Sequence, residues 1–376
     1  MPGEHAKLSA SGAYRWLACP PSAMLEAELP ESTSSYAEEG TRAHDLAEGK
    51  LTAWLKHKKR PKAEDAEMEE AVSRYVDVVL ERYAEAVGRS PDAVLLVEQR
   101  LDFSAWVPEG FGTGDAVIIA DDTLEVVDLK YGKGVPVSAK GNPQMRLYAL
   151  GAYQTYGALY DFTKVRMTIV QPRLDSVDTD EVGVGELLGW AEDEVMPKAR
   201  TAWEGGGEFA AGDHCKFCKL KATCRARAER NLELAAFDFA PPPTLSPEEI
   251  ADILRRADEL AAWAKDVQDH ALDQARNHGV RYPGWKLVEG RSNRKIADEE
   301  AAATVLMAEG YEEGKVWRRS LQTLTELEKE VGKKRLGELL ADLITKPAGK
   351  PVLVPEDDKR PEMSSIASAQ ADFTEE

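Results

Sequence analysis

Four cysteines constrain this chain more than any other feature of its sequence. Three of them, Cys215, Cys218 and Cys224, form a close-set group, and the fourth, Cys19, lies far upstream. Thiolates that hold a soft metal centre commonly come as a short cluster with partners that folding brings in. Because four thiolates complete one such site, the sequence predicts a single metal centre. This centre would fasten the N-terminal segment to the segment that carries the cysteine cluster.

Other uses of the cysteines remain open at this point. Two disulfides are one alternative, but residues 1–7 lead into polar sequence and not into the apolar leader of a secreted chain. A redox pair made by Cys215 and Cys218 would leave Cys19 and Cys224 without a role. Zinc and a [4Fe–4S] cluster both accept four thiolates, and the spacing does not separate them.

Composition and charge set wider bounds. The 376 residues are 43% hydrophobic, which leaves room for two domains or one elaborated domain. No run of 18 apolar residues occurs, so we expect no membrane span and a cytoplasmic location. The net charge of −19 disfavours polyanionic partners, but basic residues gather at 216–227 and 281–295. In the second stretch Tyr282 and Trp285 alternate with cations, a pattern typical of surfaces that grip single-stranded DNA and equally of an ordinary strand edge.

Hydrophobic periodicity predicts the elements of an α/β core. Helices are expected at 41–57, 63–87, 142–159 and 183–204, and strands at 93–98, 112–120, 123–131 and 163–171. Asn142 and Pro143 supply an N-cap and a first-turn proline for the third helix. From residue 63 the order is therefore α-β-β-β-α-β, which predicts a mixed sheet.

The same reading predicts three regions. Residues 1–239 form the core domain with its four-cysteine site, and a proline-rich linker follows at 240–244. Residues 240–345 form a C-terminal helical or α+β extension, which opens with a capping box at Ser246–Glu249. Residues 346–376, with four prolines and mixed charge, are expected to be mostly unstructured.

A pair of carboxylates marks the candidate chemistry. If the hairpin turns symmetrically about Asp121 and Asp122, Asp115 lies directly opposite Asp128. Their Cβ atoms would then be about 4.5–5.5 Å apart, where like charges repel. A divalent cation balances such a pair in otherwise apolar strands. Lys130 shares a face with Asp128, because strand positions two apart point the same way.

Two aspartates, a hard cation and a lysine suit phosphodiester hydrolysis. The metal acidifies water, and Lys130 orients that water or stabilises the charged transition state. Gln144 and Tyr148 lie one turn apart on the next helix and would hold phosphate or orient Lys130. His44 is a candidate third metal ligand, and Glu98 is a weaker one. An Asp-x-Lys triplet alone is usually accidental, so the prediction depends on the whole constellation.

These residues resemble the RecB-like branch of the PD-(D/E)XK nuclease superfamily, including AddB-type helicase-nuclease subunits and CRISPR-associated adaptation nucleases. The resemblance covers about residues 8–230. The matching motifs, in order, are Gly40-x3-His44, Gly114-Asp115, Asp128-Leu-Lys130 and Gln144-x3-Tyr148, with one early cysteine and a later C-x2-C-x5-C. The whole chain is also similar to a phage and prophage family of unknown function.

The resemblance implies a metal-dependent deoxyribonuclease, and within that class an exonuclease, that acts in phage recombination or replication in a bacterial host cell. It implies His44, Asp115 and Asp128 as Mg²⁺ or Mn²⁺ ligands and Lys130 as the catalytic lysine. It also implies a [4Fe–4S] cluster on Cys19, Cys215, Cys218 and Cys224. Asp128 stands where many relatives carry Glu, and either residue binds Mg²⁺.

The implied partners are DNA ends, single- or double-stranded, and a phage single-strand annealing protein or a helicase. Two other functions stay open. One is a non-catalytic DNA-binding recombination partner on a nuclease fold, and the other is a zinc-stabilised adaptor that works through its acidic tail. The intact acidic and lysine positions favour the enzyme.

Overall fold

The structure is a computed structural model that describes most of the chain. The described residues are 6–30, 35–59, 61, 65–233, 246–288, 299–309, 312–317, 322–340 and 343–344. The chain divides into two compact units, Met1–Gln274 and Ala275–Glu376. The predicted linker at 240–244, the cations Arg291, Arg294 and Lys295, and the predicted unstructured tail lie outside the described residues. The domain boundaries expected from the sequence stay predictions.

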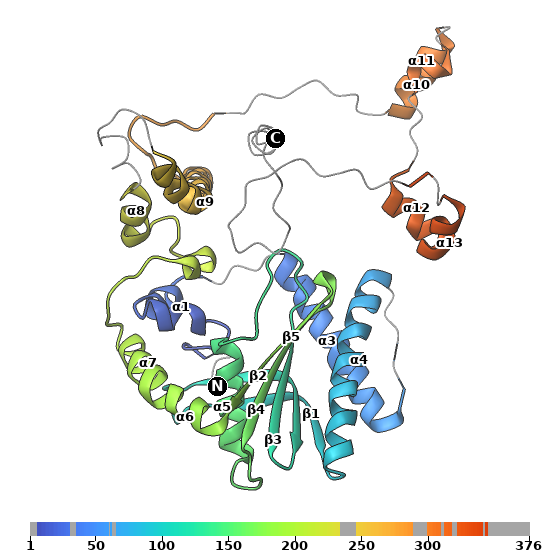
Figure 1. Ribbon diagram of the computed structural model, residues 1–376. Coiled ribbons are helices and arrows are strands. Elements are labelled where there is room, and N and C mark those ends of the chain that lie inside the picture. Colours follow the sequence, from blue (N-terminus) through green and yellow to red (C-terminus); the bar gives the residue numbers. More distant parts are fainter. Residues whose placement is uncertain are drawn as a thin grey trace, which may run out of the picture. The chain divides into compact units, whose positions relative to one another are not determined.

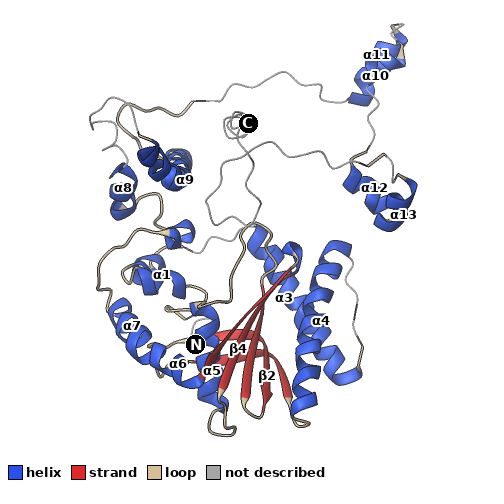
Figure 2. Cartoon of the chain, viewed as in Figure 1, coloured by secondary structure: helices blue, strands red, loops and turns tan. Residues whose placement is uncertain are grey.

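A five-stranded mixed sheet organises the first unit, so the predicted mixed α/β class is confirmed (Figure 2). Its strands lie in the order β1-β2-β3-β4-β5. They are β1 (Val94–Asp102), β2 (Phe111–Ala120), β3 (Thr123–Leu129), β4 (Lys164–Gln171) and β5 (Ser176–Gly183). Only β3 and β4 are parallel, and α5 (Pro143–Tyr156) provides the crossover that a parallel pair requires. The Asn142 side chain caps α5 as predicted, by accepting the Gln144 and Met145 N–H groups.

The β2–β3 hairpin has the register that symmetry about Asp121 and Asp122 predicts. Its pairs run from Ala120–Thr123 to Ala116–Val127, and the ladder ends there. All seven residues of β3 are buried, as expected for a central strand covered on both faces. The next positions along the two strands are Asp115 and Asp128, so the carboxylates sit where backbone pairing stops.

Helices cover both faces of the sheet (Figure 1). On one face lie α3 (Ser35–His57) and α4 (Ala66–Arg89), whose apolar sides form one core with β1, β2 and β3. On the other face α5 packs with α1 (Ala13–Ala18), α6 (Val184–Trp190) and α7 (Met196–Trp203). A π-helical segment, Ala191–Val195, joins α6 to α7 within the single helix predicted at 183–204.

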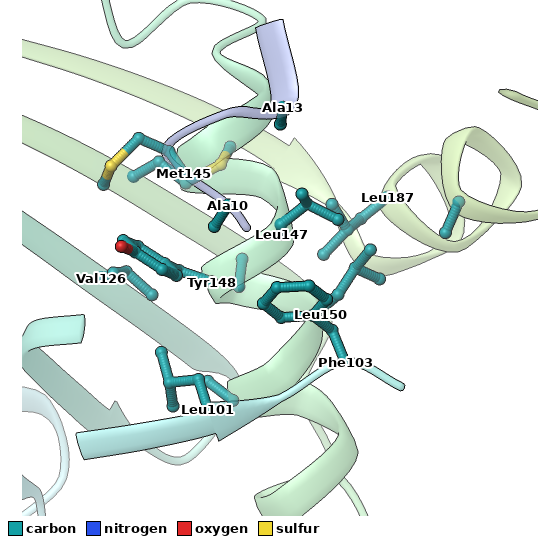
Figure 3. Close-up of a cluster of buried hydrophobic side chains, with 14 of the residues drawn as sticks. Ala10, Ala13, Leu101, Phe103, Val126, Met145, Leu147, Tyr148, Leu150 and Leu187 are labelled. Atoms are coloured by element: carbon teal, nitrogen blue, oxygen red, sulfur yellow. The ribbon is translucent and has the colours of Figure 1, made fainter. Parts of the chain in front are cut away.

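The core around α5 also includes the N-terminal segment, residues 8–17. Figure 3 shows the Tyr148 ring within this cluster, near Val126 and Leu101, with Ala10 and Ala13 of the N-terminal segment above α5. The rest of the unit consists of short elements and one long helix: α2 (Ser22–Ala27), 3-10 turns at Pro172–Leu174 and Asp213–Phe217, α8 (Arg225–Leu232) and α9 (Pro247–Asn277).

Two elements differ from the expectation. Helix α3 begins at Ser35 instead of residue 41. Strand β5 was not predicted, and its sequence explains why: Asp178, Asp180 and Glu181 give it low strand propensity. Its side chains alternate between exposed and half-buried, which is the pattern of an edge strand with one wet face.

The described part of the second unit contains helices and no strand. They are α10 (Glu299–Ala308), α11 (Glu313–Val316), α12 (Leu324–Val331) and α13 (Lys333–Leu339). Tyr282 and Trp285 lie in irregular chain before them, and Trp285 is 84% exposed. Strands in this extension stay a prediction. Across the described residues, no helix is both long and apolar enough to cross a membrane.

Gly151 provides a test of how tightly α5 packs on β1. A Cβ at Gly151 would lie 2.8 Å from Leu101 Cβ and 2.9 Å from the Leu101 carbonyl carbon. We expect Gly151→Ala to lower the free energy of unfolding by about 1–3 kcal/mol, because backbone must move. Gly49 of α3 has no atom within 4 Å of a Cβ, so Gly49→Ala should raise it by about 0.5–1 kcal/mol. Urea titration of both variants measures the difference, and equal stability of Gly151→Ala and the parent would contradict the packing.

Candidate metal and catalytic site

Asp115 lies just past the last β2–β3 backbone pair and links two elements. Its Oδ2 accepts the Leu129 N–H at 2.6 Å, where a ladder would place a backbone carbonyl. Its Oδ1 lies 3.1 Å from His44 Nδ1 of α3. The carboxylate therefore joins the hairpin to a helix on the sheet face that carries α3 and α4.

Asp128 is buried and faces Lys130. Lys130 Nζ lies 2.8 Å from Asp128 Oδ2, as the shared strand face predicts. Lys130 thus places its charge on Asp128 Oδ2, for which no other donor occurs among the described residues. Burial raises the pKa of Asp128, the Lys130 charge opposes this, and the Asp115 charge adds to it. The Lys130 ammonium therefore partly offsets the cost of burying the Asp128 carboxylate.

Gln144 connects Lys130 to Tyr148. Its Oε1 accepts from Lys130 Nζ at 3.0 Å, and its Nε2 donates to the Tyr148 hydroxyl at 3.2 Å and to Asp128 Oδ1 at 3.4 Å. Burial raises the pKa of Tyr148, so its phenol stays protonated. A Cβ at Gly112 would lie 2.6 Å from Tyr148 Cε1, so this glycine admits the ring. Gln144 was predicted either to hold phosphate or to orient Lys130. Its hydrogen bond with Lys130 agrees with the second role.

Glu98 lies in the candidate metal group, although the sequence analysis gave it only as a weaker candidate. The β1–β2 pairs Val97–Ala116 and Gln99–Gly114 flank it, and Glu98 itself is unpaired with φ of 50°. A left-handed glutamate inside a strand carries backbone strain of about 1–3 kcal/mol, and such strain clusters at functional sites. The sequence signal was only a carboxylate that ends an apolar run.

His44, Glu98 and Asp115 form the candidate metal group. One ligand atom from each lies within 4.8 Å of the other two, and no other such group occurs among the described residues. The trio expected from the sequence had Asp128 in place of Glu98. The role of Asp128 as a ligand stays a prediction, although its charge acts on His44.

The electrostatics of this group reflect crowded negative charge. Burial and the Asp115 charge raise the pKa of Glu98 to about 7. Burial opposes protonation of His44, but the hydrogen bond and charge of Asp115 together raise its pKa. Carboxylate oxygens with one imidazole are a donor set that suits Mn²⁺ and Mg²⁺. The residues present therefore fit a hard dication, which His44, Glu98 and Asp115 would hold, with Asp128 beside them.

Tyr75 of α4 contacts β3 next to the candidate metal group, and the sequence analysis did not identify it as a site residue. It is fully buried, and its hydroxyl donates to the Val127 carbonyl at 3.4 Å. Burial and the charges of Asp115 and Asp128 raise its pKa. In the sequence it is one member of an apolar helical stripe, so no local signal distinguishes it from core.

The loop between Lys130 and α5 is held by strands that follow it in the chain. The side-chain amide of Gln171 accepts the Val137 N–H at 2.7 Å and donates to the Val135 carbonyl at 3.0 Å. Two carboxylates of β5 take further groups of the loop. Asp178 Oδ2 accepts from Ser138 Oγ and the Ala139 N–H, and Asp180 Oδ2 accepts the Gly141 N–H. Lys130 lies at the start of this loop and Gln144 just after its end. The hydrogen bonds from β4 and β5 therefore help to hold these two residues at a fixed distance.

The four cysteines line one small cavity in the first unit. Cys19 and Cys215 are buried, Cys218 and Cys224 are half-buried, and all four are free thiols. Burial raises the pKa of Cys218 to about 11. Among the described residues no three of the sulfurs lie within 4.8 Å of one another.

Glu26 joins the two segments that carry these cysteines. Its Oε1 accepts the Lys219 N–H at 2.7 Å, and its Oε2 lies 3.0 Å from Arg15 Nε. The Lys219 ammonium donates in return to the carbonyls of Glu26 and Leu29. The predicted proximity of the N-terminal segment and the cysteine cluster is therefore present, whereas the metal centre itself stays a prediction.

Glu98 gives this site a pH-dependent stability in the absence of metal. Between pH 4.5 and about 7 the folded state binds the Glu98 proton more tightly than the unfolded state, so the free energy of unfolding falls as pH rises. We expect metal-free Glu98→Gln to lose less stability than the parent between pH 5 and pH 8. Urea titrations in EDTA measure this.

The exposed Glu192→Gln is the control and should follow the parent. If Glu98→Gln loses as much stability as the parent over the same interval, the raised pKa is contradicted. Saturating Mn²⁺ should abolish the Glu98-dependent fall in the stability of the parent, because a bound dication replaces the proton on the carboxylate.

Two solved structures resemble this chain weakly. One is the crystal structure of a "Putative exonuclease" from Eubacterium rectale, with 14% identity, a TM-score of 0.33 and coverage of 65% of this chain and 92% of that chain. The other is the crystal structure of SSO0001, with 16% identity, a TM-score of 0.21 and coverage of 49% and 85%. Both TM-scores are low, and neither likeness bears on the fold or the activity of this chain.

A family model matches far more of the sequence. The match spans residues 5–361, and thus both compact units. It also includes the candidate site, the four cysteines and the C-terminal extension. The chain therefore belongs to the family described as "Protein of unknown function (DUF2800)".

Proposed function

We propose that this protein is a Mg²⁺- or Mn²⁺-dependent deoxyribonuclease, acting as an exonuclease on DNA ends. The observation that carries the proposal is the convergence of Asp115, Asp128 and Lys130 where the β2–β3 ladder ends, with His44 and Glu98 beside them. An aspartate on β2 and an Asp-x-Lys at the end of β3, with a glutamine on the following helix, also agree with the PD-(D/E)XK core that the sequence resembles.

The chain's own residues prepare Lys130 for hydrolysis. In this reaction a water oxygen attacks phosphorus, the bond to the leaving nucleoside oxygen breaks, and that oxygen takes up a proton. An ammonium group has three N–H donors. Gln144 Oε1 accepts one of them, and Asp128 Oδ2 forms an ion pair with the ammonium. Lys130 thus keeps a donor for the attacking water or for a phosphate oxygen, where negative charge grows.

The carboxylates supply the other half of the site. A dication held by His44, Glu98 and Asp115 supplies positive charge near the phosphate and acidifies water. Without it the Glu98 and Asp115 carboxylates repel each other and a phosphate, and burial together with this repulsion raises the pKa of Glu98. Activity should therefore require a divalent cation and stop in EDTA, whereas full activity in EDTA would refute the role of the metal.

Lys130→Ala should lower the rate of DNA cleavage by about 10²–10³-fold, because the group that stabilises the transition state is absent. Asp115→Asn should also abolish cleavage and weaken Mn²⁺ binding, because the charge is gone. Its amide oxygen can still accept the Leu129 N–H, so we expect the fold to persist. Release of nucleotides from end-labelled DNA measures cleavage, and calorimetry measures Mn²⁺ binding.

Lys133→Ala is the matched control for this experiment. Lys133 lies three residues further along the loop, is 64% exposed, and has its nearest carboxylate, Glu67, at 3.9 Å. Its removal should leave cleavage at the level of the parent. If Lys130→Ala cleaves DNA as fast as Lys133→Ala does, the assignment of the site is wrong.

We also propose that Cys19, Cys215, Cys218 and Cys224 hold a structural [4Fe–4S] cluster. All four line one cavity, which supports a single shared centre. Zinc and a [4Fe–4S] cluster both accept four thiolates, and the resemblance to RecB-like nucleases favours the cluster. The Cys218 thiol, whose pKa is raised by burial and by the Glu26 charge, has little reason to ionise without such a centre.

Anaerobically purified protein should be brown and contain about four irons per chain. Cys218→Ser should lose the visible absorbance and lower the melting temperature, because one ligand is gone. Thr223→Ala, an exposed change in the same loop, should keep both. Iron and sulfide analysis with thermal unfolding measures these outcomes. A colourless protein with one zinc per chain would replace the cluster by zinc.

The partners and the cellular setting remain predictions. A phage single-strand annealing protein or a helicase is the proposed partner, and the bacterial host cytoplasm is the proposed location. The proposed DNase activity does not depend on either, because it needs only DNA ends and a dication.

A further inference from the structure

A large cavity in the first unit begins at the candidate catalytic lysine. It has a volume of about 1040 Å³, and Lys130 and Gln144 lie on its wall. The loop before α5 forms one side, and the N-terminal segment and the cysteine segment form another, with Tyr14 and Phe217 among their lining residues. The proposed cleavage site and the segments joined by Glu26 therefore share one continuous space.

Two exposed aromatic rings lie on this cavity. Tyr14 is 57% exposed and Phe217 is 64% exposed. His214 supports Tyr14 from the side, with ring centroids 6.4 Å apart and an interplanar angle of 73°. Stacking of a base on such a ring contributes about 1–3 kcal/mol. In a duplex the base faces are already covered by their neighbours, so exposed rings favour an unpaired strand.

Two cations without an ion-pair partner in the described part of the chain line the same cavity. Among the described residues, neither Lys140 nor Lys216 forms an ion pair, although both line the cavity. Lys216 Nζ also lies 5.6 Å from the centre of the Phe217 ring. By contrast, Lys221 and Arg227 are both engaged by Asp266. Lys140 and Lys216 are thus the cations that are available to phosphate groups.

The wall that carries Lys140 is preformed and also presents a helix N-terminus. Gly141 and Asn142, at the start of α5, line the cavity. The N-terminal end of a helix favours anions. Gln171, Asp178 and Asp180 hold this loop in place by the hydrogen bonds described above. On α9, Asp258 and Glu259 line the cavity as well, and their negative charge directs a phosphate backbone towards the lysines.

We propose that this cavity binds a single-stranded segment of DNA. Bases stack on Tyr14 and Phe217, and Lys140 and Lys216 contact the phosphates. The strand then continues to the scissile phosphate at Lys130. This inference rests on the proposed nuclease function and adds the form of the substrate and the residues that bind it.

Binding in the absence of cleavage tests the inference. Full-length Asp115→Asn protein in EDTA, with labelled oligothymidylate, a duplex of equal length or oligouridylate, gives the affinities by fluorescence anisotropy. Oligothymidylate should bind more tightly than the duplex. Adding Tyr14→Ala and Phe217→Ala should weaken oligothymidylate binding by at least about tenfold, because two bases no longer have a ring to stack on.

Matched variants separate stacking from folding. Tyr14→Phe keeps the ring and should bind as the Asp115→Asn protein does. Phe209→Ala removes a ring that is 53% exposed but lines the neighbouring cysteine cavity instead, so it should have no effect. Lys140→Ala with Lys216→Ala should lower the salt dependence of binding by about 0.7 for each phosphate that is no longer neutralised. Lys198→Ala, on α7, is the charge control and should leave the salt dependence unchanged.

The inference is overturned if Tyr14→Ala with Phe217→Ala binds oligothymidylate as tightly as the Asp115→Asn protein. Equal affinity for duplex and single strand would also overturn it, and tighter binding of oligouridylate would overturn DNA as the ligand. Tight, ring-dependent binding by a wild-type protein that fails to cleave DNA would leave the inference intact and refute the nuclease function. Normal cleavage together with binding that does not depend on the rings would refute the inference and leave the nuclease function intact.

Discussion

Asp115 ends a β-ladder with a side chain. Backbone pairing between β2 and β3 stops at Ala116–Val127, and the next N–H, that of Leu129, bonds to the Asp115 carboxylate. Because the carboxylate has a second oxygen, the same group also reaches His44. A backbone carbonyl in its place would continue the sheet but would bring no negative charge to balance a cation. The site lies where a side-chain carboxylate replaces a backbone carbonyl as the acceptor of the Leu129 N–H.

Negative charge collects around this interruption. Glu98 faces Asp115 from the neighbouring strand, and Asp128 follows the last pair on the other side. Burial of unneutralised carboxylates is costly, and among the described residues only the Lys130 ammonium and the His44 imidazole pair with these three. The raised pKa of Glu98 follows from this imbalance. A bound cation would relieve this imbalance, which is the physical basis of the proposed chemistry.

Local patterns predicted the centre of this site and missed its surroundings. The turn at Asp121–Asp122 and the alternation along the strands give the register that places Asp115 near Asp128, and the Asn142 cap fixes where Gln144 begins its helix. The position of Glu98 in the site depends on a left-handed backbone conformation, and no glycine or turn motif in the sequence indicates it. Tyr75 contributes through a contact across 52 positions of sequence, and the bridge from Glu26 to Lys219 spans 193. Contacts of that range carry no periodic signal.

Strand β5 shows how a weak strand sequence can be useful. Because Asp178 and Asp180 point towards the loop while Thr179 and Glu181 face water, neither face of this strand is apolar along most of its length. Its free edge would otherwise offer unpaired backbone groups to a second chain. Charged side chains on the border strand discourage such edge-to-edge association. The composition that hides β5 from sequence analysis therefore also helps to keep the sheet at five strands.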